Sequence, residues 1–286
     1  MPFLMALASS VLYGVADFLG GVGSRRGPAV VITAWFQVAG VLPLVLYSAL
    51  APGVTRAEDL AWGAAAGVAG GTGVLLLYHA LATGIVSTVA PLISMIALTV
   101  PVVVGLVGGE RPGGVPLLGI GVGLVAVMLI SAHGGASHEP IAPQAKEPSR
   151  LRSLAPALAS GVLIGLFLAF LCRVQPGSSG WPLVMGRATA TVCAFALLFA
   201  SRLPVFPPAG THVFILGGAV TDVSANVLYL LAVQRAPLSL IATLVSLAPA
   251  TTVLLAQLTL REKLGPQQRW GVALALVAVV MLSSNT

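Results

Sequence analysis

Long apolar runs, separated by short breaks, make up most of this chain. A run of about 20 mostly apolar residues is long enough to cross a bilayer as a helix. Ten runs meet that criterion, at residues 3–22, 29–50, 60–82, 85–107, 114–132, 153–172, 182–200, 211–232, 238–260 and 267–284. The pattern therefore predicts an all-α integral membrane protein with ten transmembrane helices.

The breaks between the runs hold turn residues and charges. Two of them, at Thr83-Gly84 and Arg235-Ala236-Pro237, are so short that tight helical hairpins are expected. One segment, 133–152, is long, charged and rich in proline, so we expect it to be a flexible polar linker outside the bilayer. It separates a first five-span half, 1–132, from a second, 153–286.

The two halves resemble each other. Ala6-Leu-Ala-Ser9 recurs as Ala157-Leu-Ala-Ser160. Further on, a constant shift of 152 residues pairs Ala90 with Ala242, Ser94 with Ser246, Glu110 with Glu262, Gly113 with Gly265, and Gly119 with Gly271. Because each half has an odd number of spans and the linker does not cross, the two repeats must be inverted. Secondary transporters are often built this way, with a site between the halves that is exposed alternately to each side.

Composition agrees with a membrane protein. Only 8% of the residues are charged and 57% are hydrophobic, whereas soluble domains carry about 25% charged residues. The net charge of +6 fits loops that face anionic lipid, and no basic run is long enough for a nucleic-acid patch. Cys172 and Cys193 lack metal-ligand spacing, and we assign them no disulfide. We expect a lipid environment, no cofactor, no bound metal and no nucleic-acid partner.

Signatures of other membrane functions are missing from the sequence. The spans hold no HExxH pair, no acid pair at protease spacing and no serine–histidine arrangement, which argues against an enzyme. There is no nucleotide-binding loop and no repeated selectivity filter. Alternating-access transport of a small solute is the leading interpretation. The alternatives are a gradient-independent facilitator, a flippase for a lipid-linked substrate, and a non-transporting membrane partner protein.

Two of the eight acidic residues, Asp17 and Asp222, lie inside spans. A charged Asp at the centre of a span costs about 2.5–3.5 kcal/mol on insertion scales. Asp222 lies about 15 Å from either end of its run, near the bilayer midplane. Asn226 and Tyr229 follow at helical spacing on the same face. The three side chains predict a site for substrate or protons; the alternative is that they join helices.

Asp17 lies about two turns from the end of its run, and Tyr13 lies one turn before it. It could pair with a cation, reach water at the membrane edge, or face a cavity. Loss of water disfavours the charged form of a carboxyl group. If Asp17 faces a cavity, it and Asp222 are therefore the candidates for carrying a proton.

Five further polar or aromatic residues in spans are candidates for lining a cavity. Arg187 lies near the start of its run, so it either snorkels to the surface, binds an anionic group, or balances an Asp. Trp35 and Gln37 could line the cavity, with packing as the alternative for Trp35. Ser246 and Gln257 share one face of the ninth run and either line the cavity or pack.

The repeat-related Glu110 and Glu262 lie at loop entrances, beside Arg111 and Lys263. This arrangement indicates loops joined by salt bridges.

Three stretches carry a family resemblance: Tyr13–Gly21 (YGVADFLGG), Gly109-Glu110, and Ser246–Gln257 (SLAPATTVLLAQ) followed by Glu262. With ten spans in two halves, the chain resembles the EamA-type transporters of the drug/metabolite transporter (DMT) superfamily, and its opening resembles one bacterial branch. The likeness covers nearly the whole chain. Relatives often carry an aromatic residue where this chain has Ala248, so no substrate is carried over.

The resemblance implies a multi-pass protein of the bacterial inner, or plasma, membrane. It also implies that spans three, four, eight and nine surround a central cavity. Many members of the family export metabolites or drugs. Export of a small metabolite, amino acid or drug-like solute, with possible coupling to protons, is therefore the expectation for this chain.

Charge and resemblance predict opposite orientations. Lys and Arg are more numerous on the side that holds Arg25, Arg26 and the linker, which by the positive-inside rule places both termini outside. The family resemblance implies that both termini are inside. The sequence does not indicate an oligomeric state.

Overall fold

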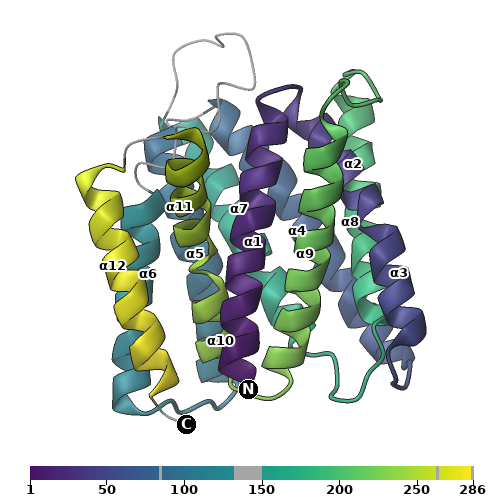
Figure 1. Ribbon diagram of the computed structural model, residues 1–286. Helices are drawn as coiled ribbons and strands as arrows, with labels where there is room; N and C mark the ends of the chain where they lie inside the picture. Colours follow the sequence, from purple (N-terminus) through teal and green to yellow (C-terminus); the bar gives the residue numbers. More distant parts are fainter. Residues whose placement is uncertain (84–85, 132–149, 262–263, 285–286) are drawn as a thin grey trace.

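The computed structural model describes residues 1–83, 86–131, 150–261 and 264–284. These residues form helices joined by short loops (Figure 1). The helices are α1 (Pro2–Ser24), α2 (Ala29–Ala39), α3 (Val41–Leu50), α4 (Ala57–Thr83), α5 (Val86–Val107), α6 (Gly114–Ser131), α7 (Arg150–Leu171), α8 (Trp181–Ala200), α9 (His212–Val233), α10 (Leu238–Val245), α11 (Ala248–Leu260) and α12 (Pro266–Ser283). The predicted all-α membrane fold is confirmed.

Two of the predicted spans are broken rather than continuous. The second is divided at Gly40 into α2 and α3, and the ninth is divided at Ser246 and Leu247 into α10 and α11. A proline lies just after each break, at Pro43 and Pro249. Proline has no N–H for the carbonyl four residues earlier, so the helical hydrogen-bond ladder is interrupted at these two places.

Nine spans within the described residues are long and apolar enough to cross a membrane. The second and ninth each combine two helices, as Ala29–Leu50 and Leu238–Leu260. The helix α12 completes the second repeat and is less apolar, because Gln267, Gln268 and Arg269 lie in its first turn. Most of the predicted linker, and the turn after Thr83, lie outside the described residues.

The two repeats run in opposite directions through the molecule. The helix α1 begins, and α12 ends, on one side of the bundle, which we call the terminal side (Figure 1). The helix α6 ends and α7 begins on the opposite side, which we call the linker side. Each helix of the first repeat therefore points opposite to its counterpart in the second.

Helix contacts follow the same inverted symmetry. The pair α1 and α9 matches the pair α7 and α4, and the pair α1 and α11 matches α7 and α5. The pairs α6–α12 and α2–α8 each join a helix to its own counterpart. These contacts confirm the two inverted five-span repeats predicted from the sequence.

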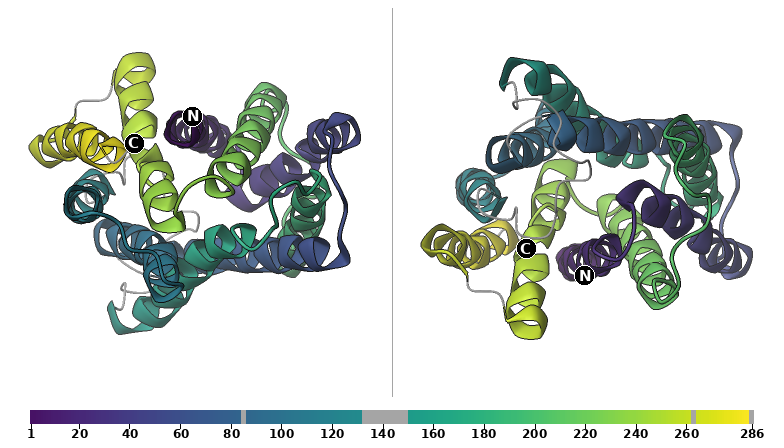
Figure 2. Two further views of the ribbon diagram at one scale, coloured as in Figure 1. Left: turned by 90° about the horizontal axis from the view of Figure 1, so that it is seen from below. Right: turned by 90° about the horizontal axis from the view of Figure 1, so that it is seen from above.

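The spans form a ring with one pair outside it. Figure 2 shows α1, α9 and α11 along one side and α4, α5 and α7 along the other, with α6 and α12 together at one end. The helices α2 and α8 close the other end. Gly161 and Gly165 let α7 approach α5 closely, because an added Cβ would lie 2.7 Å from Ile96 and 2.6 Å from Val100.

The terminal side of the ring is sealed by packed side chains. All eight residues of α10 are buried there. The six apolar residues among them belong to the main core cluster together with Leu98 of α5, Leu171 of α7 and Tyr229 of α9. The carboxylate of Glu110 accepts backbone hydrogen bonds from Leu238, at 2.5 Å, and Ser239, at 2.9 Å, at the start of α10.

This contact corrects the expected salt-linked loop at Glu110. The neighbouring guanidinium of Arg111 donates to the backbone carbonyls of Leu106 and Glu110 instead of to the carboxylate. The predicted counterpart, Glu262, lies outside the described residues. Glu110 therefore caps a helix of the other repeat.

Candidate functional site

A cavity of about 510 Å³ lies inside the ring of helices. It extends from mid-span residues to the linker side, where Arg25 at the end of α1, Ser131 at the end of α6 and Leu260 at the end of α11 line it. Both repeats contribute to its wall. Its lining includes Ala16, Asp17, Phe18, Ile32, Thr33, Phe36, Gln37, Val74, Leu77, Ala90, Ile93, Ser94, Ala97, Ile164, Arg187, Asp222, Pro249, Thr252 and Val253.

A chain of polar side chains forms the deep end of this cavity. The Arg187 guanidinium donates through Nη2 to Asp222 Oδ2 and through Nη1 to Gln37 Oε1. Asn226 Nδ2 donates to the same Asp222 oxygen at 3.2 Å and to the Asp222 backbone carbonyl at 2.8 Å. Three helices, α2, α8 and α9, are thereby joined through one guanidinium.

Arg187 does not snorkel to the membrane surface, as a residue near a helix end often does. Its side chain is only 7% exposed and forms an ion pair with Asp222, whose side chain is 19% exposed. Gly40, at the break between α2 and α3, leaves room for it, because an added Cβ would lie 3.0 Å from the guanidinium carbon. Of the three alternatives predicted for Arg187, the structure supports the third, because its guanidinium balances the charge of Asp222.

Asp17 faces the cavity without a charged partner. Its side chain is exposed and lines the cavity wall. Within the part of the chain that the structure describes, it forms no ion pair and no hydrogen bond. It lies near enough to Asp222 for their charges to interact.

Tyr13 lies one turn from Asp17, toward the terminal side. Its hydroxyl is buried and has no hydrogen-bond partner among the described residues. The charges of Asp222, Arg187 and Asp17 all act on this phenol. Tyr13 is therefore adjacent to the polar cluster, beneath the floor of the cavity.

Tyr229 lies apart from Asp222 and Asn226, although the three share one helix face. The Tyr229 side chain is fully buried in the core of the terminal side, and its hydroxyl donates to the Leu168 carbonyl at 2.8 Å. It joins α9 to α7 and does not line the cavity. Helical spacing predicted that Tyr229 faces the interior of the bundle. It does so two turns further toward the terminal side than Asp222, beyond the deep end of the cavity.

Three further predicted residues lie outside the cavity lining. Trp35 donates from its indole nitrogen to the Val205 carbonyl at 2.7 Å and packs beside Phe206, with ring centroids 5.7 Å apart. Ser246 lies at the break before α11, and Gln257 is exposed. Ala248, the position of an expected aromatic residue, is buried.

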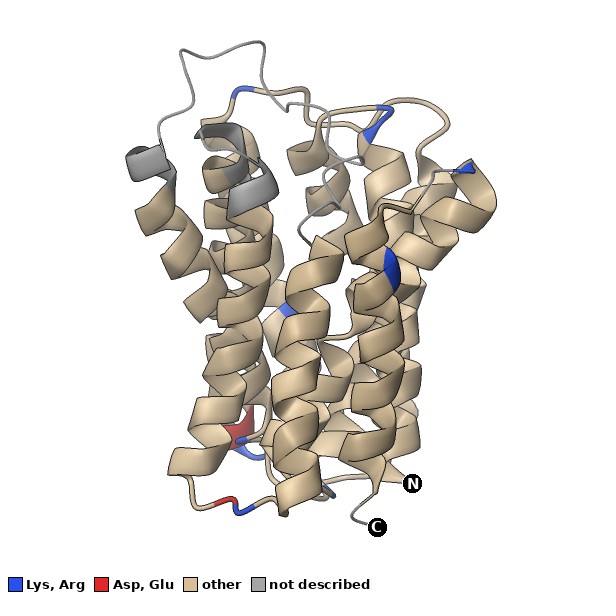
Figure 3. Cartoon of the chain, turned by 90° about the vertical axis from the view of Figure 1, so that its left-hand side faces the viewer, with Lys and Arg blue, Asp and Glu red and all other residues tan. Residues whose placement is uncertain are grey.

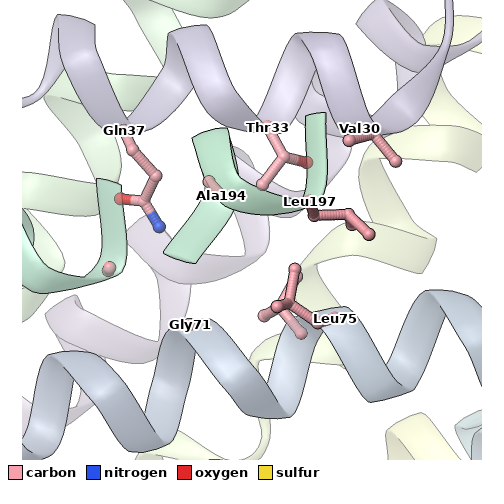
Figure 4. A pocket seen from close by; sticks show the side chains of 9 residues that line it. Val30, Thr33, Gln37, Gly71, Leu75, Ala194 and Leu197 are labelled. Atoms are coloured by element: carbon pink, nitrogen blue, oxygen red, sulfur yellow. The ribbon is translucent and has the colours of Figure 1, made fainter. Parts of the chain in front are cut away.

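A small pocket adjoins the polar cluster between α2, α4 and α8. Thr33 and Gln37 of α2 face Gly71 and Leu75 of α4 across it (Figure 4). Its volume of about 10 Å³ is the space of a single water molecule. The pocket is lined by Gln37, whose amide oxygen accepts a hydrogen bond from Arg187.

Several lining residues were not singled out from the sequence. Phe18, Thr33, Phe36 and Thr252 look like ordinary span residues, and only their position in the ring makes them part of the wall. Among the described residues, no group of three His, Cys, Asp or Glu side chains gathers as a metal site.

Inverted repeats around a one-sided cavity with charged groups at its deep end are the architecture of many multi-pass membrane transporters. The sequence profile of the EamA-like transporter family matches residues 1–132 and 151–284, and the chain belongs to that family, within the DMT superfamily. The resemblance predicted from the sequence is confirmed. The four spans that the resemblance placed around the cavity do line it, through α4, α5, α9 and α11. The helices α1, α2, α6, α7 and α8 contribute lining residues as well.

A solved structure described only as the crystal structure of a protein has a similar fold. The TM-score is 0.76 at 18% sequence identity, and the match covers 99% of this chain and 96% of that one. At this identity, the likeness shows the fold alone. No curated protein matches this chain.

Proposed function

We propose that this protein is a secondary transporter of the bacterial plasma membrane that exports a small solute by alternating access, coupled to protons. The observation that carries the proposal is the one-sided cavity between two inverted repeats. It is lined by two carboxylates, Asp17 and, at mid-span, Asp222, and it ends at the sealed core of the terminal side.

Alternating access is supported by a difference between repeat-related segments. The start of α5 and the whole of α10 are counterparts, yet Ala90 of α5 lines the cavity whereas Ala242 of α10 is fully buried. Likewise, Leu92 is partly accessible and Leu244 is fully buried. The same structural unit is thus seen in two arrangements, and exchanging them would open the terminal side.

Proton coupling is supported by the two carboxyl groups. Asp17 is unpaired in the cavity, and Asp222 shares its deep end with Arg187. Protonation of Asp222 would remove one charge of the ion pair and free the guanidinium. A proton entering from the cavity would therefore alter the contact that joins α8 to α9.

The proposal is tested by untargeted profiling of the medium of cells with and without the protein. We expect at least one compound to accumulate in the medium only with the active protein. We expect its export to stop when the proton gradient is collapsed and to be lost in Asp222→Asn. Glu58→Gln, an acid-to-amide change at an exposed residue of the terminal side, is the matched control and should export normally.

Other outcomes would replace the proposal. Export that continues without a gradient would identify a facilitator. No difference for any compound would leave a non-transporting partner protein as the remaining interpretation.

A further inference from the structure

We infer that the transported solute is a small organic cation, a protonated amine on an apolar body, and that Asp17 is the residue that binds its charge. This inference rests on the proposed function and specifies the substrate class of the same cavity. It selects cations over the zwitterions and anions of similar size that the family resemblance leaves open.

The first argument is the unpaired carboxylate. Asp17 is exposed to the cavity, and no Lys, Arg or His among the described residues pairs with it. A charge inside a membrane protein is costly unless it is paired. A cationic solute would supply the missing partner.

The second argument is that the deep guanidinium is already occupied. Arg187 donates to Asp222 and Gln37, and its side chain is only 7% exposed. A solute carboxylate could bind Arg187 only by displacing Asp222, which would leave that carboxylate buried without its partner. Arg25, at the mouth of the cavity, also has an interaction partner.

The third argument is the charge of the deep end as a whole. Asp17, Asp222 and Arg187 all line the cavity, and the three groups together carry one negative charge when both carboxyl groups are ionised. One monovalent cation neutralises this set. An anion would raise the uncompensated charge to two, and a zwitterion would leave its own carboxylate without a donor.

The remaining wall suits an apolar body. Phe18, Phe36, Ile32, Ile93 and Val253 line the same cavity as the carboxylate. The hydroxyl groups nearby are largely used within the protein: Thr252 donates to the Gly14 carbonyl at 3.0 Å, and Ser94 accepts from Ser131 at 3.3 Å. A solute with a single charged group and an aromatic or aliphatic remainder fits these surfaces.

The test compares three probes that share a phenylethyl body and differ in charge. They are 2-phenylethylamine, phenylalanine and 3-phenylpropionate, which are a cation, a zwitterion and an anion at neutral pH. The full-length protein is purified in detergent, and binding is measured as a saturable rise in its thermal unfolding temperature. We expect the amine to bind and the other two to give no saturable shift.

Variants at Asp17 test its role directly. Asp17→Asn should weaken amine binding about tenfold or more, the factor that corresponds to losing one modest ion pair. Asp17→Glu keeps the charge and should retain binding, which excludes misfolding as the cause of the loss. Glu58→Gln is the control with unchanged binding.

Three results would overturn the inference: binding of phenylalanine or 3-phenylpropionate as tight as that of the amine, amine binding unchanged in Asp17→Asn, or no response to the amine at millimolar concentration. The proposed function is judged separately in proteoliposomes. Transport of a zwitterion would retain the transporter and reject the cation. Amine binding without transport would retain the cation site and reject the transporter.

Discussion

The surroundings of Arg187 limit which solute groups can bind at the deep end of the cavity. Its guanidinium joins Asp222 and Gln37 at the deep end of the cavity. Removing one partner of a buried ion pair leaves the other charge uncompensated, at a cost of about 3–5 kcal/mol. The ion pair therefore contributes both to the free energy of unfolding and to the net charge at the deep end of the cavity.

We expect Arg187→Gln to lower the free energy of unfolding by about 3–5 kcal/mol, because Asp222 is left buried without its counter-charge. The double variant Arg187→Gln/Asp222→Asn removes both charges and should recover part of that loss. Unfolding in detergent, followed by circular dichroism, measures both. A double variant at least as unstable as the sum of the two single variants would contradict this view of the pair.

Tyr229 is expected to affect stability but not transport. Tyr229→Phe removes one buried hydrogen bond to the Leu168 carbonyl, which costs about 0.5–1.5 kcal/mol. The transport rate should stay near that of the wild type, since the phenol does not line the cavity. A large loss of transport in a stably folded Tyr229→Phe protein would show that this residue belongs to the site.

Individual residues of the site were predicted only in part. A carboxylate or a guanidinium in an apolar run is conspicuous, so Asp17, Asp222 and Arg187 could be identified from the sequence. An Asp was one of three alternatives for the partner of Arg187, and the sequence could not select it, because the contact with Asp222 joins two helices and depends on Gly40 at the break in a third span. Tyr229 shows the limit of face arguments, since a helix face contacts different neighbours along its length.

At the scale of elements, α10 and its cap lie in the sealed core of the terminal side. The Glu110 carboxylate receives two backbone hydrogen bonds at the start of α10. Hydrogen bonds to a charged group contribute about 1.5–3 kcal/mol each, and a negative charge at a helix N-terminus is favoured by the helix dipole. Glu110 belongs to the first repeat, so the cap holds the two repeats together at the terminal side.

We expect Glu110→Gln to weaken the seal of the terminal side. In a protein whose Cys172 and Cys193 are replaced by Ala, a cysteine introduced as Ala242→Cys lies in fully buried α10. Its labelling by a membrane-impermeant maleimide from the terminal side should be slow, and should become several-fold faster with Glu110→Gln. Glu58→Gln should leave it slow. Equal rates with and without Glu110→Gln would show that the cap does not control the seal.

The elements themselves were largely predictable. Run length and hydropathy placed every span to within a few residues, because a helix that crosses lipid must satisfy all its backbone groups internally. The breaks in the second and ninth spans were missed. Pro43 and Pro249 remove the relevant hydrogen bonds, yet Pro91 and Pro101 remove similar ones inside α5, which continues without a break. The presence of a proline alone therefore does not predict where a span is broken.

At the scale of the whole molecule, alternating access makes a paired prediction. Ala90→Cys, on the cavity wall, should be labelled from the linker side, while its repeat counterpart Ala242→Cys is protected. During turnover with solute and a proton gradient, labelling of Ala242→Cys from the terminal side should rise as labelling of Ala90→Cys falls. Changes in the same direction at both positions would rule out exchange between two sealed states.

Orientation decides which solution the cavity faces. The acidic positions visible in Figure 3 lie near the end that holds the termini, whereas the opposite end shows only basic ones. The linker side carries Arg25, Arg26, Arg202, Arg261 and Arg269, and the terminal side carries Arg56, Arg111, Arg173 and Arg235.

A reporter fused to the C-terminus, active on only one side of the membrane, measures the orientation. The family resemblance predicts a cytoplasmic C-terminus, and the cavity then faces the exterior. An exterior C-terminus would agree with the positive-inside count, and the cavity would then face the cytoplasm, ready to load an exported solute.

The charged residues of the cavity do not follow the internal repeat of the chain. The positions related to Asp17, Arg187 and Asp222 by the 151- or 152-residue repeat shift hold no charged residue: they are Leu168 or Ala169, Trp35 or Phe36, and Gly70 or Gly71. Two identical repeats would populate both facing states equally, so any resting preference must come from positions at which the repeats differ. A few substitutions at such unmatched positions, away from the solute, would then be enough to reverse that preference while leaving the architecture intact.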